Sequence, residues 1–137
     1  MKNVLGVCLI ALTMCHVVAA QDPTVPVLRP GISVQLPVSH QATAMPEADQ
    51  QDVTVVTITV DGNLYVGTRP VEPGELTGLT ASPVYVKADA RVSSQQLLTV
   101  LSALSNHQVV LLTLPTVTPA PGKLLPPYGV SLTLGRR

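Results

Sequence analysis

Residues 84–92, VYVKADARV, run directly into residues 93–106, SSQQLLTVLSALSN, and this junction decides the fold. Apolar residues alternate with Tyr85 and Lys87 at its start, which is typical of a half-buried strand. Ser93-x-x-Gln96 is a capping box for the start of a helix. Apolar residues then recur at helical spacing (Leu97, Val100, Leu101 and Leu104). The junction therefore predicts a strand over residues 84–88, followed at once by a helix packed on a sheet.

Three further segments carry strand patterns. Residues 53–60 are rich in β-branched side chains, and Asp61-Gly62-Asn63 offers residues that accept the positive φ of a tight turn, so residues 53–67 are predicted to form a hairpin. Residues 32–36 alternate apolar and polar residues before Pro37. Residues 109–114 are nearly all apolar, which favours a central or interface strand.

A second helix is expected over residues 73–82. Pro73 suits a first helical turn, Glu75 follows early in the segment, and Leu76 and Leu79 are three residues apart, although the segment also holds two glycines. The sequence thus predicts an α+β domain in which two helices pack on a small mixed β-sheet. The hairpin and the strands 84–88 and 109–114 are expected at the centre of this sheet.

Composition and charge exclude several classes of function. Eight basic and eight acidic residues balance in a chain of 137 residues, so no net field attracts nucleic acid. Both cysteines, Cys8 and Cys15, lie in the apolar N-terminus, so no intramolecular disulfide or thiolate metal site is expected in the domain.

The N-terminal residues 1–20 have the three features of a secretory signal peptide: a basic residue at the start, Lys2, then an apolar run, then small residues before a cleavage site after Ala20. Retention as a single membrane anchor is the alternative, because residues 4–20 approach the roughly 17 to 25 residues that cross a bilayer. We expect a Pro-rich linker over residues 21–30, a domain over residues 31–115 and a Pro-rich C-terminal tail over residues 116–137, in which residues 130–134 could add an edge strand.

The residues of the chain do not predict an enzyme. The exported part has two histidines, His40 and His107, with no cysteine and no acidic cluster at ligand spacing, so we predict no catalytic residue, no cofactor and no metal site. Lys87, Asp89 and Arg91 are the remaining candidates, at the corner between strand and helix. Alternating charges there most often form local ion pairs or cap the helix, and contact with a partner is the functional alternative.

The ordered segments resemble the periplasmic domain of the ExbD/TolR family of biopolymer-transport proteins over residues 24–115. The resemblance is carried by VYVKADARV and its helix together with GISVQLP at residues 31–37, DGNLYVGTRPV at residues 61–71 and the strand at residues 109–115. It implies a homodimer that works in proton-motive-force-dependent transport or envelope maintenance beside a polytopic channel subunit and an envelope-spanning energy transducer. Some family members also bind peptidoglycan through this domain.

The resemblance also exposes a departure in the membrane segment. Relatives carry an aspartate there that takes part in proton flow, and the corresponding position here is near Leu12, with no acidic residue anywhere in residues 1–21. A leucine cannot accept or release a proton, and His16 is the only ionisable side chain in the apolar run. Two hypotheses follow: an accessory component of envelope transport that lacks this aspartate, or an exported periplasmic binding or scaffold domain without energy-transducing activity.

Overall fold

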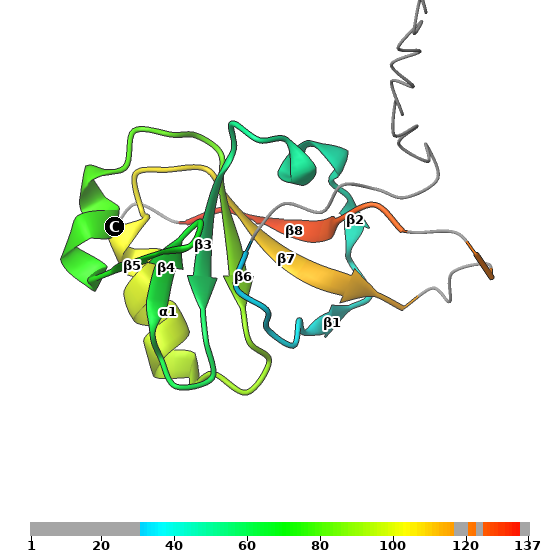
Figure 1. Cartoon of the computed structure of the whole chain (residues 1–137), viewed down its shortest axis with the longest axis horizontal. Coiled ribbons are helices and arrows are strands. Elements are labelled where there is room, and N and C mark those ends of the chain that lie inside the picture. The colour runs from blue at the N-terminus through cyan, green and yellow to red at the C-terminus, as the bar shows by residue number, and fades with distance from the viewer. Residues whose placement is uncertain (1–30, 117–120, 123–124, 135–137) are drawn as a thin grey trace, which may run out of the picture.

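The computed structural model describes residues 31–116, 121–122 and 125–134, and the predicted signal segment, linker and Leu12 lie outside these residues. Within them the chain forms, in order, β1 (Val38–Ser39), β2 (Thr43–Ala44), the 3₁₀ helix η1 (Pro46–Asp49), β3 (Thr54–Ile58), β4 (Leu64–Val66), β5 (Arg69–Val71), the 3₁₀ helix η2 (Pro73–Gly78), β6 (Val84–Ala88), α1 (Ser94–Ala103), β7 (Val109–Pro115) and β8 (Tyr128–Leu132). Figure 1 shows their arrangement.

The strands form one mixed sheet in the order β2-β8-β7-β6-β3-β4-β5, and the short β1 pairs with β7. The parallel pairs β3–β6 and β6–β7 form its centre, flanked by antiparallel partners on both sides. The face of the central strands toward α1 is apolar, with side chains such as Val56, Val86 and Val109, whereas the opposite face also carries Thr57 and Lys87. Of the segments predicted at the centre, β3, β6 and β7 lie there, whereas β4, the second strand of the hairpin, lies between β3 and the edge strand β5.

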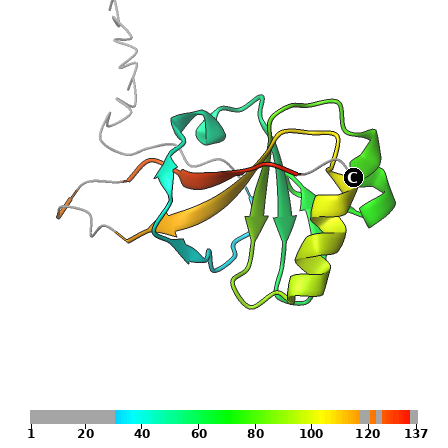
Figure 2. The same cartoon turned by 180° about the vertical axis from the view of Figure 1, so that it is seen from behind.

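The two faces of the sheet carry separate apolar clusters. The larger cluster joins the inward side chains of β3, β6 and β7 to Leu76 of η2 and to Val100 and Leu104 of α1 and its C-cap. Helix α1 lies in front of the sheet in Figure 2 and covers this face. The smaller cluster on the opposite face consists of Ala48 of η1 with Tyr85, Val110 and Leu112. No α-helix covers that face within the described residues, which leaves it only partly filled.

The prediction of two helices packed on the sheet is wrong. Only α1 is an α-helix among the described residues, and the second predicted helix is the six-residue 3₁₀ helix η2, in which Leu76 is the buried residue. Each interior glycine costs roughly 1 kcal/mol relative to alanine, and Gly74 and Gly78 stand four residues apart in this short segment. A capping box between Glu72 and Glu75 stabilises the first turn of η2, and the chain returns to extended conformation at Leu79.

The predicted hairpin is confirmed as β3 and β4, which pair antiparallel through Val56 and Val66. Gly62 adopts φ +81° in the connecting turn, a backbone conformation that residues other than glycine rarely adopt. The predicted strand at residues 32–36 is not formed, because the ladder with β7 begins only after Pro37, at Val38. Residues 31–37, here called the lead-in segment, are instead held by hydrogen bonds to the corner that follows β6.

The C-terminal residues contribute more to the sheet than a tail with an edge strand would. Strand β8 lies between β7 and β2 and extends over Tyr128–Leu132, inside the segment that we assigned to the Pro-rich tail. Its Gly129 packs closely against β7, since a β-carbon built at this position would lie 2.8 Å from Cγ1 of Val110 and 3.0 Å from the carbonyl oxygen of Leu111. This part of the C-terminal segment therefore belongs to the folded domain.

Candidate functional site

Asp89 is the centre of the corner between β6 and α1. Its side chain is 3% exposed, and its two carboxylate oxygens accept hydrogen bonds from Nε and Nη2 of Arg91 at 2.9 and 3.0 Å. The backbone N–H of Arg91 donates to Oδ1 at 3.0 Å, and the backbone N–H of Gln35 donates to Oδ2 at 3.1 Å. Four donors thus compensate a buried carboxylate, which would otherwise be costly to bury.

These donors stabilise the ionised form of the carboxyl group. The hydrogen bonds from the Arg91 side chain, and then that from its backbone N–H, hold the pKa of Asp89 well below its usual range, against the opposing effect of burial. The same side-chain hydrogen bonds raise the pKa of Arg91. The pair is therefore charged throughout the physiological pH range, and it acts as a fixed structural clamp.

The clamp attaches the lead-in segment to the sheet. The backbone of Gln35 is both a donor and an acceptor: its N–H donates to Asp89, and its carbonyl accepts from the N–H of Ala90 at 2.7 Å. The Lys87 ammonium donates to the carbonyl of Ile32 at 2.6 Å, and the N–H of Leu114 donates to the carbonyl of Pro37 at 2.7 Å. The lead-in segment is therefore fixed along its length to the ends of β6 and β7.

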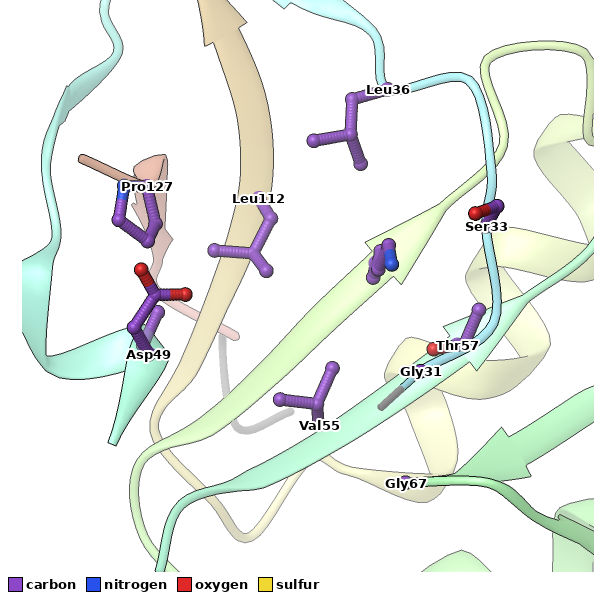
Figure 3. Close-up of a pocket in the computed structure, with 11 residues that line it drawn as sticks. Gly31, Ser33, Leu36, Asp49, Val55, Thr57, Gly67, Leu112 and Pro127 are labelled. Carbon is purple, nitrogen blue, oxygen red and sulfur yellow. The ribbon is translucent and has the colours of Figure 1, made fainter. Parts of the chain in front are cut away.

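A pocket of about 360 Å³ lies between the lead-in segment, η1 and the sheet face opposite α1. Figure 3 shows Leu36, Val55 and Leu112 pointing into the space at its centre, with Asp49 beside Pro127 on one side and Thr57 on the other. Lys87 also lines this pocket, and its partial burial lowers the pKa of its ammonium group. Gly31, Ser33, Ala48, Gly67 and Pro127 complete the lining.

The three residues singled out from the sequence lie at one place but have different environments. Lys87 faces the pocket, Asp89 is buried in the clamp, and the Arg91 side chain is 61% exposed. The arrangement agrees with the expected local ion pair, and contact with a partner through these residues stays a prediction. Of the three, Arg91 presents the largest charged surface to an incoming molecule.

His107 lies in a structural contact, not in a catalytic arrangement. Nε2 of His107 lies 2.6 Å from the carbonyl oxygen of Leu79, so the ring ties the end of η2 to the turn after α1. Its Nδ1 is buried without a hydrogen-bond partner among the described residues. No group of three or more metal-ligating side chains occurs in the ranges that the structure describes. Nor does any helix in those ranges have the length and apolar character needed to cross a membrane.

Sequence reasoning missed the pocket itself. Thr57 follows from the alternation of the hairpin strand, since it must lie on the same face as Val55, opposite the helix. Asp49 and Leu36 carry no such signal, because they reach the pocket from segments whose position depends on the clamp and on η1. Long-range packing, rather than any local motif, assembles these walls.

No protein-family model matches this chain, and no curated protein matches its sequence.

Proposed function

We propose that this chain is a non-enzymatic, ExbD/TolR-like accessory component of the cell envelope, in which residues 31–134 form a binding domain outside the inner membrane. It works beside a polytopic channel subunit and an envelope-spanning energy transducer, as a homodimer, in proton-motive-force-dependent transport or envelope maintenance. Peptidoglycan is a further candidate for the bound partner.

One observation supports this proposal most strongly, namely the attachment of the lead-in segment to the corner after β6. Asp89 and Lys87 hold Gln35 and Ile32 by hydrogen bonds of 3.1 and 2.6 Å. A domain that is tethered through its N-terminal side transmits force only if the first residues of the domain are fixed to its core. Charge-assisted hydrogen bonds to a buried carboxylate are suited to this task.

The alternative is an exported binding or scaffold domain without energy-transducing activity. It is favoured by Val18-Ala19-Ala20, which places small residues before a cleavage site, and by Leu12 near the position of the family's intramembrane aspartate. In this case the domain keeps its partner surface, and the apolar segment serves only for export.

Sequencing the N-terminus of the protein from fractionated cells distinguishes the two functions. A start at Met1 in the membrane fraction, with a channel subunit co-purifying, supports the accessory component, and a start at Gln21 in the periplasm supports the exported binding domain. Full-length protein in the cytoplasm would contradict both.

Two variants at the cleavage site make this experiment sharper. Ala20→Arg places a large charged residue at the last position before the cut, which blocks signal cleavage, whereas Gln21→Arg places the same residue just beyond it. If cleavage occurs after Ala20, the first variant accumulates as the longer form while the second is processed. Equal processing of both variants would show that Ala20 is not the cleavage position.

A further inference from the structure

The floor of the pocket between the lead-in segment and the sheet carries two polar groups side by side. Thr57 and Lys87 are direct neighbours in the parallel ladder of β3 and β6, and both side chains line the pocket. Thr57 is 2% exposed, and its hydroxyl can donate one hydrogen bond and accept others. The Lys87 ammonium has three donors, one of which binds the carbonyl of Ile32. The floor therefore offers the hydroxyl of Thr57 and the remaining donors of Lys87 to a bound molecule.

The remaining walls are mostly apolar. Leu36, Val55 and Leu112 point into the centre of the pocket (Figure 3), whose volume of about 360 Å³ lies at the lower end of the range for small-molecule sites. Apolar walls with a few convergent polar groups are the usual composition of such a site. The donors on the floor can bind a carboxylate, and the apolar walls can contact a hydrocarbon group attached to that carboxylate.

Asp49 restricts the ligand further. Its carboxylate belongs to the same pocket lining, at the end of η1, on the side that Figure 3 shows beside Pro127. A second anionic group on the ligand would meet this charge, and like charges at short range repel each other. The pocket therefore favours a ligand with one carboxylate at one end over a dicarboxylate.

We propose that this pocket binds the carboxylate of a small apolar monoacid, with Lys87 and Thr57 as its hydrogen-bond donors and Leu36, Val55 and Leu112 around its hydrocarbon part. The carboxylate belongs either to a free short-chain acid or to the C-terminus of an apolar peptide. This site goes beyond the proposed function, since it does not depend on how the N-terminus is processed or on a channel partner.

Titration of the purified full chain, followed by backbone amide NMR, tests the site with four matched probes. Hexanoate and N-acetyl-Val-Leu carry the carboxylate, and hexanol and the C-terminal amide of the same peptide lack it. The proposal expects one carboxylate probe to bind about tenfold or more tightly than its neutral counterpart, with the largest shifts at residues 57 and 87. Adipate is expected to bind more weakly than hexanoate because of Asp49.

Three variants assign the donors. Lys87→Met and Thr57→Val each remove one donor at nearly unchanged size, and we expect binding to weaken about tenfold and at least threefold, respectively. Arg69→Met is the matched control, because it removes one positive charge from β5, outside the pocket, and should leave affinity unchanged.

Several results would overturn the proposal. Equal binding of acid and neutral probes would do so, as would shifts located away from the pocket, or unchanged affinity in folded Lys87→Met. If that variant does not fold, the comparison of hexanoate with hexanol on the unmodified chain decides alone. Preference for hexanoate identifies a free acid, and preference for the peptide identifies a chain terminus.

Discussion

Gly129 in β8 provides a direct measure of how much the C-terminal segment contributes to the domain. A β-carbon at this position would lie 2.8 Å from Cγ1 of Val110 and 3.0 Å from the carbonyl oxygen of Leu111, and the latter belongs to the backbone ladder between β7 and β8. The backbone oxygen cannot move away without disturbing that ladder. Overpacking of this kind costs about 1–3 kcal/mol, so Gly129→Ala is expected to destabilise the fold.

Gly74 in η2 is the matched control, since a β-carbon there meets no atom within 4 Å. Replacing glycine by alanine reduces the entropy of the unfolded chain in both variants by a similar amount, about 0.4–1 kcal/mol in favour of folding. The difference between the two variants therefore isolates the steric term. We expect Gly129→Ala to be less stable than Gly74→Ala by about 1–3 kcal/mol, which corresponds to a melting temperature roughly 4–20 °C lower.

Urea unfolding followed by circular dichroism measures this difference, provided that the dependence of the unfolding free energy on urea is the same for both variants. A difference below about 0.5 kcal/mol would refute the reasoning, because surface substitutions without specific contacts fall within that range. Such a result would mean that β8 does not pack against β7 as described, and that the C-terminal segment does not belong to the folded domain.

Three other substitutions, one of them with a matched control, test the clamp and the core. Asp89→Asn should lower the melting temperature at pH 7, and this deficit should shrink below about pH 4, because a depressed carboxyl pKa contributes stability above the unfolded value that is lost as the pH falls. Leu104→Ala should cost about 2–5 kcal/mol in urea unfolding, whereas Leu98→Ala, at a residue 61% exposed, should cost less than about 0.5. Thr113→Val removes a buried hydroxyl that lacks a partner among the described residues and should stabilise the domain by about 1 kcal/mol, measured in the same assay.

Local patterns predicted the hairpin, the strand at 84–88, the following helix and the strand at 109–114. In each case the information lies within a few residues: the alternation around Val56, the turn at Gly62 and the cap at Ser93, whose hydroxyl accepts from the N–H of Gln96 at 3.2 Å. The prediction of an α-helix at η2 was wrong because the spacing of Leu76 and Leu79 fits both an α-helix and a short 3₁₀ helix. The glycines at 74 and 78 favour the short 3₁₀ helix. Only the packing shows that one buried leucine, Leu76, attaches this segment to the core.

The candidate site depended far more on long-range contacts. The charges of Lys87, Asp89 and Arg91 were visible in the sequence, yet their partners Ile32 and Gln35 lie more than 50 residues away along the chain. The predicted strand at 32–36 failed for the same reason, since its backbone groups bind this corner and do not enter a ladder. A pattern of alternating residues cannot distinguish these two ways of satisfying backbone hydrogen bonds.

The sequence by itself determined the strands at 84–88 and 109–114 and the helix that covers one face, because their apolar periodicity and capping are properties of neighbouring residues. Only the tertiary structure decided that β8 joins the sheet, that the lead-in segment is clamped by Asp89, and that a pocket remains on the face opposite α1. Each of these features depends on which distant segments fill the volume beside the sheet. Which segments fill this volume is decided by close packing between distant parts of the domain, and a pattern of neighbouring residues does not contain that information.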